Sequence, residues 1–314
     1  MIANPERTVV VSSVGWVDHD VLWRFDVPTA DAARIPLGSG ARHLSLHSSG
    51  SSHFAVAHHF DGERFELTVR VFSDPTRVLA RAAVAEREMS LSGDPEVWTQ
   101  VPRLYADYLR FPPWKDFVLF LVSPATGQIE VQRLAWYDDT YDKGYQGITD
   151  VLGAPDGCSA LVSVQRSSQV IVHDLATGHK RASFELAGRG GNPKLAFRSS
   201  AQEIWASDYD TMVVLDGKTW RPIRTARLQG AAGGAQQFIG DYSFGPDEGS
   251  CVVARPFSGD VVGIDPSTLR IKRRARLGRQ PLEVAALPEG EVLARDWKTG
   301  DVLRGKLTRR WFAG

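Results

Sequence analysis

The sequence predicts an all-β protein, and three observations support this prediction. One pattern recurs through residues 146–307: an apolar run, a polar turn, a second apolar run, a loop rich in charged and aromatic residues, and a third run that ends near Asp or Gly. The period of about 40 to 50 residues is typical of β-propeller blades with four short strands each. About seven units of this length account for nearly the whole chain of 314 residues. The sequence therefore predicts a seven-bladed β-propeller of four-stranded antiparallel blades.

The uniform repeat favours one domain over residues 1–314, although the length alone would allow two average domains. The expected blades have the approximate boundaries 7–38, 41–86, 95–136, 147–187, 191–230, 236–278 and 280–314.

The first and last blades are expected to be incomplete. Residues 8–27 contain two β-rich runs and residues 31–38 a third, with no room upstream for an innermost strand. The seventh blade has only residues 308–314 left for its last strand. Because an open propeller would leave edge strands unpaired, we expect the N- and C-terminal segments to complete the ring together.

The inner blades are predicted from β-forming runs and from the turns between them. In the second blade, the run 52–60 alternates in polarity until it reaches His58. The other runs of the second and third blades cover residues 41–50, 64–72, 76–84, 106–111, 117–122 and 130–137. Segments 191–193 and 278–281 each combine Gly and Pro before an inner strand, where Gly allows unusual backbone angles and Pro interrupts the ladder.

The charge balance points to neither nucleic acid nor membrane, since Lys and Arg together number 37 and Asp and Glu together also number 37. No apolar run approaches the roughly 20 residues of a membrane span. The first residues lack the basic start and long apolar core of a signal peptide. These features predict a cytoplasmic protein without nucleic-acid or membrane partners.

The two cysteines fit the same compartment. Cys158 and Cys251 open equivalent strands of two blades that have another blade between them, which is too far apart for a disulfide. We expect both to be free, buried thiols, as in a reducing environment.

The later repeats share short turn motifs. A Pro-Asp turn precedes a β run at Pro155-Asp156 and at Pro246-Asp247, and an Asp precedes a Thr-containing turn at Asp174, Asp216 and Asp265. In these features the chain resembles the YVTN-type repeat of bacterial seven-bladed propellers, which is similar to the quinoprotein amine dehydrogenase β-propeller superfamily. The resemblance implies a propeller fold. Members of that superfamily include lyases, dehydrogenase subunits and proteins with a binding role alone, so the resemblance does not select a reaction.

The candidate site lies on one rim of the expected propeller, where the loops between second and third strands meet the crossings between blades. When the blades are aligned at the end of their second strands, one aligned position contains His58, Arg110, Arg166, Ser207, Arg255 and Arg295. Two residues further on, several blades place an aromatic residue: Phe60, Tyr209, Phe257 and Trp297, with Trp16 in the first blade.

Four arginines and a histidine on one rim predict a positive surface that holds a carboxylate or phosphate through forked guanidinium bonds. Aromatic neighbours would supply flat surfaces for a sugar, a ring or a peptide side chain. The expected ligand-binding set also includes Arg189, Asn192, Asp208 and Asp296. A structural alternative stays open, in which arginines at strand ends pair with acidic residues of the next blade, namely Asp94, Asp208 and Asp296.

Two functions fit this pattern. A binding or scaffolding propeller would recognise an anionic small molecule, a glycan or a partner protein on the rim rich in arginine and aromatic residues, and the repetition of the pattern favours it. The alternative is a metal-assisted lyase or hydrolase at the same channel mouth, with His43 or His58 as the base and Arg166, Arg255 or Arg295 stabilising negative charge. The sequence contains no metal-binding motif and identifies no cofactor.

Overall fold

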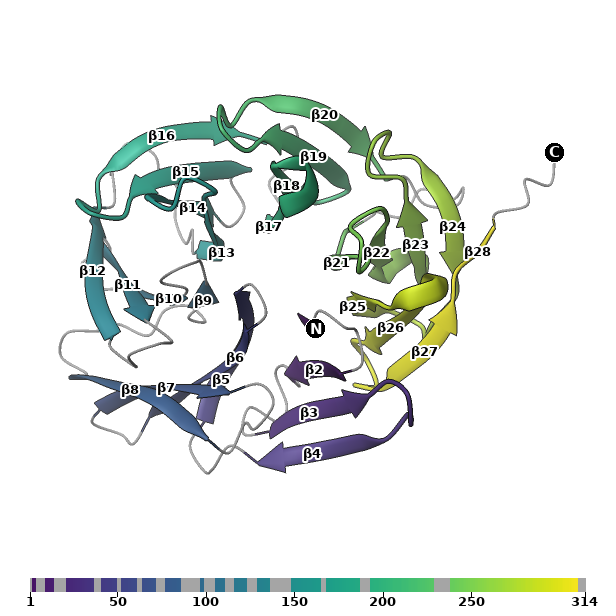
Figure 1. Ribbon diagram of the computed structural model, residues 1–314, viewed down its shortest axis with the longest axis horizontal. Helices are drawn as coiled ribbons and strands as arrows, with labels where there is room; N and C mark the ends of the chain where they lie inside the picture. Colours follow the sequence, from purple (N-terminus) through teal and green to yellow (C-terminus); the bar gives the residue numbers. More distant parts are fainter. Residues whose placement is uncertain are drawn as a thin grey trace. The chain divides into compact units, whose positions relative to one another are not determined.

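The computed structural model describes residues 2–3, 9–13, 21–36, 41–49, 52–60, 64–71, 77–85, 97–98, 105–110, 116–122, 129–135, 148–164, 168–186, 193–228 and 238–309. Regular structure in these ranges consists of β-strands and short 3₁₀ helices, which confirms the all-β prediction (Figure 1). The chain divides into two compact units, Val9–Glu185 with Ile2, and Leu186–Gly314 with Met1 and Ala3–Thr8. Among the described residues, no helix has the length and apolar character needed to span a membrane.

In the described residues, the unit Val9–Glu185 with Ile2 accounts for four sheets of four strands, apart from Ala3 at the end of the first strand, and each strand is hydrogen-bonded to the next in sequence. The first sheet consists of β1 (Ile2–Ala3), β2 (Val9–Ser13), β3 (Val21–Asp26) and β4 (Ala32–Pro36). The second consists of β5 (Ala41–Ser49), β6 (Ser52–Phe60), β7 (Arg64–Val71) and β8 (Val78–Ala85). The third consists of β9 (Val97–Trp98), β10 (Tyr105–Arg110), β11 (Asp116–Val122) and β12 (Ile129–Ala135). The fourth consists of β13 (Ile148–Gly153), β14 (Ser159–Val164), β15 (Gln169–Asp174) and β16 (Lys180–Glu185).

Over residues 193–228 and 238–309, the unit Leu186–Gly314 contributes three further antiparallel sheets. The first consists of β17 (Lys194–Arg198), β18 (Glu203–Asp208), β19 (Thr211–Asp216) and β20 (Pro222–Arg227). The second consists of β21 (Asp241–Phe244), β22 (Cys251–Arg255), β23 (Asp260–Ile264), β24 (Ile271–Ala275) and β28 (Thr308–Arg309). The third consists of β25 (Pro281–Ala286), β26 (Glu291–Asp296) and β27 (Val302–Lys306). The 3₁₀ turns η2 (Ser199–Ala201), η3 (Pro256–Ser258) and η4 (Pro288–Gly290) connect strands within these sheets.

The core of this second unit explains why its central strands are apolar throughout. Side chains of a strand alternate between its two faces. In β22, Cys251 and Val253 belong to a cluster that includes Trp205 of the preceding sheet, whereas Val252 and Ala254 belong to a cluster with β25 and β26. Both faces of β22 are therefore buried, and a strand buried on both faces shows a continuous apolar run in place of alternation.

The turns that follow the third strands have a shared cause. Asp174 and Asp216 accept a hydrogen bond at Oδ1 from the backbone N–H three residues later, at 2.9 Å from Thr177 and 2.7 Å from Thr219. Asp265 does the same with Thr268 at 3.3 Å. The backbone hydrogen bonds, together with the threonine hydroxyls, lower the pKa of Asp174 and of Asp216. The Asp and Thr of the repeat therefore build tight turns between the third and fourth strands.

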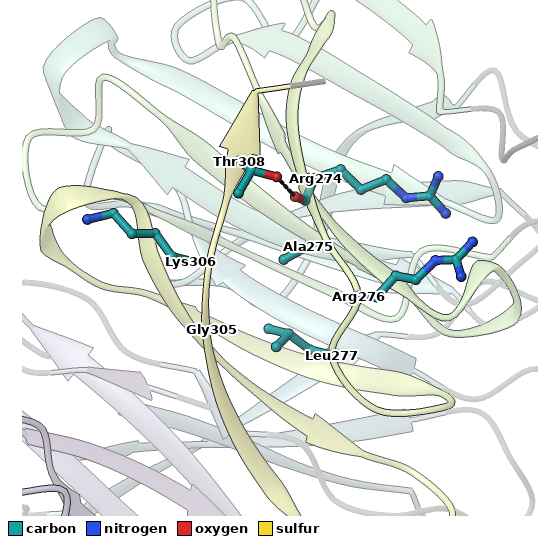
Figure 2. Close-up of a pocket in the computed structure, with 7 residues that line it drawn as sticks. All are labelled: Arg274, Ala275, Arg276, Leu277, Gly305, Lys306 and Thr308. Atoms are coloured by element: carbon teal, nitrogen blue, oxygen red, sulfur yellow. Dashed lines mark hydrogen bonds between the residues drawn. The ribbon is translucent and has the colours of Figure 1, made fainter. Parts of the chain in front are cut away.

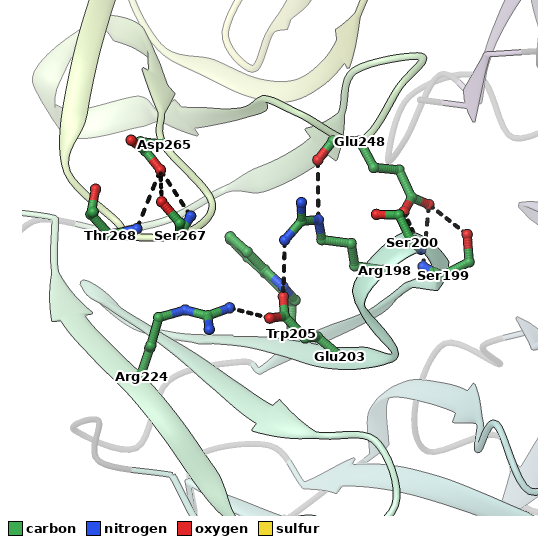
Figure 3. Close-up of polar contacts among 10 residues, drawn as sticks. All are labelled: Arg198, Ser199, Ser200, Glu203, Trp205, Arg224, Glu248, Asp265, Ser267 and Thr268. Atoms are coloured by element: carbon green, nitrogen blue, oxygen red, sulfur yellow. Dashed lines mark hydrogen bonds and ion pairs between the residues drawn. The ribbon is translucent and has the colours of Figure 1, made fainter.

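A polar network around Glu203 joins the sheet of β17–β20 to the turn before β22 (Figure 3). Glu203 accepts hydrogen bonds from Trp205 Nε1 at 3.0 Å, Arg198 Nη1 at 3.2 Å and Arg224 Nη2 at 2.5 Å. Burial alone would raise the pKa of Glu203, but these donors lower it. Arg198 Nε also donates to the backbone carbonyl of Glu248 at 3.0 Å. This network fixes one end of two neighbouring sheets.

The chain ends differ from the expectation. The first sheet does have an innermost strand, β1, which consists of two residues and is too short to be visible as a β-rich run. Residues 308–309 do not extend the sheet of β25–β27, because β28 pairs with β24 of the preceding sheet, with Arg274 opposite Thr308. The expected boundary that begins the seventh blade at residue 280 therefore separates β28 from the sheet to which it belongs.

Both cysteines are free, as expected, but only one is buried. Cys251 is the first residue of β22 and lies in the core. Cys158 is exposed because it lies in the turn before β14, which begins at Ser159. The expectation of two buried thiols was wrong at Cys158.

Candidate functional site

The candidate site in the unit Leu186–Gly314 is a surface on loops at one end of its three sheets. We call it the loop surface and define it by its five residues, Tyr209, Phe238, Phe257, Arg279 and Trp297. Tyr209, Phe257 and Trp297 lie between the second and third strands of the three sheets, whereas Phe238 and Arg279 lie in the crossings that lead into β21 and β25.

Backbone contacts hold these loops and crossings together. The N–H of Ile239 donates to the carbonyl of Tyr209 at 2.7 Å, which places Phe238 beside the first loop, and the Phe238 and Phe257 rings lie 6.1 Å apart. The N–H of Trp297 donates to the carbonyl of Gln280 at 2.8 Å. These contacts agree with the expectation that loops and crossings share one side of the sheets.

Gly259 brings the second loop close to Arg279. Its φ of +63° favours glycine, and a Cβ at this position would lie 3.1 Å from the carbonyl oxygen of Arg279. Arg279 therefore lies between the loop that carries Phe257 and the loop that carries Trp297, and its side chain is exposed.

Two aromatic side chains of the loop surface are open to solvent although their backbones are fixed. Phe257 is 48% exposed and Trp297 is 49% exposed. Large apolar side chains at this level of exposure, gathered on rigid loops around a cation, are typical of binding surfaces.

Arg255 does not reach solvent. It is the last residue of β22, it is buried, and its Cα lies opposite that of Asp260 in the hairpin with β23. Its Nε and Nη2 donate to the two carboxylate oxygens of Asp260 at 2.9 and 2.6 Å. This ion pair is formed within one hairpin, whereas the structural alternative supposed an acidic residue of the next blade.

Arg295 forms the equivalent pair in the next sheet. It is buried, and its Nε and Nη2 donate to Glu283 at 3.1 and 2.6 Å. Burial alone would raise the pKa of Glu283, but nearby positive charge, including Arg295, lowers it to about 2. Each of these two arginines is therefore balanced by a carboxylate of its own sheet.

Asp296 has a structural role in the loop that carries Trp297. Its Oδ2 accepts the backbone N–H groups of Arg279 and Gln280 at 2.6 and 2.8 Å, and its Oδ1 accepts those of Lys298 and Thr299 at 2.9 and 3.2 Å. Burial raises its pKa, but the four donors lower it overall. The carboxylate joins the crossing to the loop through backbone groups and, among the described residues, forms no ion pair with an arginine side chain.

The other predicted site residues that the structure describes lie in β5, β6, β10 and β18 or next to these strands. Asp208 is buried at the end of β18, and the adjacent Tyr209 has a φ of +56°. The Cα atoms of His43 and His58 are direct partners in the register of β5 and β6, and Arg110 ends β10 opposite Phe117. The residues that fall outside the described ranges are the predicted site residues Arg166, Arg189 and Asn192, together with Trp16 of the aromatic pattern and Asp94 of the structural alternative.

Among the residues that the structure describes, no group of three or more His, Cys, Asp or Glu side chains is arranged to hold a metal ion. The described loop surface consists of aromatic rings and a guanidinium group, which bind through apolar contact, hydrogen bonds and charge.

Sequence reasoning did not include Phe238 and Arg279 in the site. Both precede inner strands, in crossings that carry Gly240 and Gly278. Residues just before the Gly of each crossing would have been candidates, because the loops between second and third strands are hydrogen-bonded to these crossings.

No family model matches the chain, and no curated protein is similar to it in sequence. Solved structures are similar in fold. A chain of the mitotic checkpoint complex has a TM-score of 0.68 and 8% identity, over 98% of this chain and 89% of that one. The β-propeller domain of Cps50 (Swd1) from Myceliophteria thermophila has a TM-score of 0.68 and 12% identity, and the match covers 98% of this chain and 95% of that domain. A putative 6-phosphogluconolactonase from Bacteroides fragilis has a TM-score of 0.67 and 15% identity, and the match covers 96% of this chain and 92% of that protein. The chain has a β-propeller fold.

Proposed function

We propose that this protein is a binding propeller that docks an acidic segment of a partner protein on the loop surface. One observation carries the proposal: Phe257 and Trp297 are each about half exposed on loops that backbone hydrogen bonds hold in place beside Arg279.

The energetics favour aromatic anchors of this kind. Trp, Tyr and Arg dominate the residues that contribute most binding energy at protein interfaces. Loops that are already fixed lose little conformational entropy on binding, so more of the contact energy remains as affinity. The loop surface thus has the composition and the rigidity of an interface.

The charges indicate the chemistry of the partner. Arg255 and Arg295 are neutralised within their own sheets by Asp260 and Glu283. In the described part of the chain, the exposed Arg279 has no such ion pair, so its charge is available to a carboxylate of the partner. One of the structurally similar chains comes from the mitotic checkpoint complex, which supports a role in protein binding.

A crosslinking experiment tests this function. A photoreactive phenylalanine analogue replaces Phe257, Trp297 or, as the control, Ile223, which is 48% exposed on the outer strand β20. We expect the first two positions, and not the third, to capture one protein covalently in cells of the source organism. The same proteins at all three positions would contradict the proposal.

The captured partner is then purified and its affinity is measured by calorimetry. Loss of two anchors worth about 2 kcal/mol each weakens binding roughly a thousandfold in the double variant Phe257→Ser, Trp297→Ser. Ile223→Ser should bind like the wild type. Equal affinity in the double variant would contradict the proposal.

The metal-assisted lyase or hydrolase is the second candidate, and one observation favours it. His43 and His58 are Cα partners in the register of the neighbouring strands β5 and β6, and histidine is a common zinc ligand. Calorimetry with Zn²⁺ and Mn²⁺ tests it, with the expectation that His43→Ala and His58→Ala each abolish binding. Metal binding that survives in both variants would exclude this function.

A further inference from the structure

The segment that contains β24 and the crossing after it is strongly basic. Residues 270–279 contain six cationic side chains and no acidic one, although Lys and Arg together equal Asp and Glu in the whole chain. Two of the six have a carboxylate beside them, since Arg274 contacts the buried Asp260 and Lys272 lies 3.7 Å from Asp265. The local excess of positive charge therefore comes from the other four, which are Arg270, Arg273, Arg276 and Arg279.

These four arginines are exposed, and in the part of the chain that the structure describes none of them forms an ion pair. The arginines within β20 and β27 differ, because they pair with an acidic side chain of their own sheet. Arg227 of β20 lies 2.7 Å from Asp210, and Arg304 of β27 lies 2.6 Å from Glu291. The charge along β24 is therefore not balanced within the sheet in the same way.

The charges surround the outer strand and do not form one flat contact face. Arg274 and Arg276 extend to one side of β24, away from Leu277 (Figure 2). Side chains alternate along a strand, so Arg273 projects from the other face, where a Cβ at Gly290 would lie 2.8 Å from its Nη1. A ligand in contact with all these groups would have to wrap around the strand. The arrangement suits a charge that acts at a distance better than a contact site.

The segment leads to the loop surface, because its last residue, Arg279, belongs to that surface. We call Arg270, Arg273 and Arg276 the arginine stripe. A fully extended chain spans at most about 3.6 Å per residue, so the Cα atoms of Arg276 and Arg273 lie within about 11 and 22 Å of that of Arg279. The Debye length is about 8 Å at physiological ionic strength and about 30 Å at 0.01 M. The field of the stripe therefore reaches the loop surface at low salt and is largely screened at high salt.

We propose that the arginine stripe steers the acidic segment of the partner toward the loop surface and thereby increases its rate of association. This inference rests on the proposed function, since it needs an anionic partner at that surface. Fixed charges of one sign beside a binding site raise the local concentration of an oppositely charged partner. Charges outside the contact change the association rate and its salt dependence more than the dissociation rate. The stripe thus favours acidic partners before any contact forms.

A measurement of the surface potential tests the stripe without the partner. Soluble nitroxide radicals enhance the NMR relaxation of nearby amides, and a carboxylate-bearing probe is compared with an ammonium-bearing one. We expect the carboxylate probe to accumulate at residues 270–279, and to do so less in the double variant Arg273→Gln, Arg276→Gln. The matched control is Lys218→Gln, Arg221→Gln, which removes two exposed cations between β19 and β20. Equal accumulation of the two probes in the wild type would overturn the proposal.

Stopped-flow mixing of the full chain with the protein captured at Phe257 and Trp297 tests the steering itself. At about 10 mM salt, the variant Arg273→Gln, Arg276→Gln should bind on the order of fivefold more slowly, with a dissociation rate changed less than about twofold. The difference should disappear at about 500 mM salt. The control variant should match the wild type at both salt concentrations. Circular dichroism checks that all variants keep the fold.

The outcomes separate this inference from the proposed function. An unchanged association rate in Arg273→Gln, Arg276→Gln, while Phe257→Ser, Trp297→Ser still loses affinity, would overturn the steering and leave the loop surface as the binding site. Wild-type affinity in Phe257→Ser, Trp297→Ser would instead contradict the proposed function. A single-stranded oligonucleotide that binds the wild type but not the stripe variant would also overturn the steering, because it would assign the stripe to nucleic acid.

Discussion

Asp260 holds Arg255 in a two-point ion pair inside the protein, with Oδ1 accepting from Nε at 2.9 Å and Oδ2 accepting from Nη2 at 2.6 Å. The two residues are cross-strand partners in the hairpin of β22 and β23, and both side chains are almost completely buried. The same carboxylate also contacts Arg274. The local fold therefore depends on one negative charge that two cations share.

Replacing Asp260 by Asn should lower the free energy of unfolding by about 3 to 5 kcal/mol, because it removes the buried negative charge that Arg255 and Arg274 share. Urea unfolding followed by circular dichroism measures this loss. The control is Asp265→Asn, which removes a charge from a turn at the surface and should cost about 1 kcal/mol. Similar losses in the two variants would show that the buried pair has no special role.

Replacing Gly305 by Ala should destabilise the fold by about 1 to 3 kcal/mol, since its methyl group collides with Leu277. Shortening Leu277 to Ala in the same chain should recover part of the loss, which a double-mutant cycle of unfolding free energies detects. Additive effects of the two substitutions would contradict the packing of Leu277 over Gly305.

The pair of Glu283 and Arg295 predicts loss of stability in acid. The folded-state pKa of Glu283 is lowered from 4.5 to about 2, so the unfolded state binds a proton first as the pH falls. The stabilisation is complete above about pH 4.5 and is lost between that pH and about pH 2. In Glu283→Gln, the pH dependence of the unfolding free energy should decrease in this window by on the order of 2 kcal/mol. An unchanged profile would contradict the lowered pKa.

The buried His173, in the unit Val9–Glu185, predicts a second loss of folding stability as the pH falls, which begins at a higher pH than the loss at Glu283. The ring is buried, and its Nδ1 lies 3.2 Å from the carbonyl oxygen of Gly178. Burial is the main reason that its pKa is lowered from 6.5 to about 4. The neutral ring is therefore stabilised above about pH 6.5, and this contribution is lost as the pH falls to about 4. NMR titration of the ring should give the lowered pKa, and a midpoint near 6.5 would contradict its burial.

The architecture could be predicted because its signal is repeated. The apolar runs of central strands such as β22 follow from burial on both faces, and the Asp and Thr turns close hairpins through local hydrogen bonds. The short strands β1 and β28 could not be predicted, because two residues carry no periodicity. The seven-blade count and the resemblance to the YVTN-type repeat stay predictions.

The candidate site was predicted less completely. Alignment of the loops selected Phe257 and Trp297, which are each about half exposed, and their role in binding stays a prediction. The same alignment could not show whether Arg255 and Arg295 face solvent, since that depends on strand register. Arg255 has Asp260 as its cross-strand neighbour, and a β-bulge between Pro281 and Glu283 brings Glu283 opposite Arg295.

The position of β28 has a consequence for the order in which the chain folds during synthesis. Strand β24 ends at Ala275, but its outer edge is covered only when Thr308 and Arg309 have left the ribosome. Until then, the sheet of β21–β24 exposes a strand edge, and the core that includes Val252 and Ala254 lacks Leu307. The last two sheets therefore reach their final form together, and the nascent chain is most prone to aggregation until residues 307–309 have emerged.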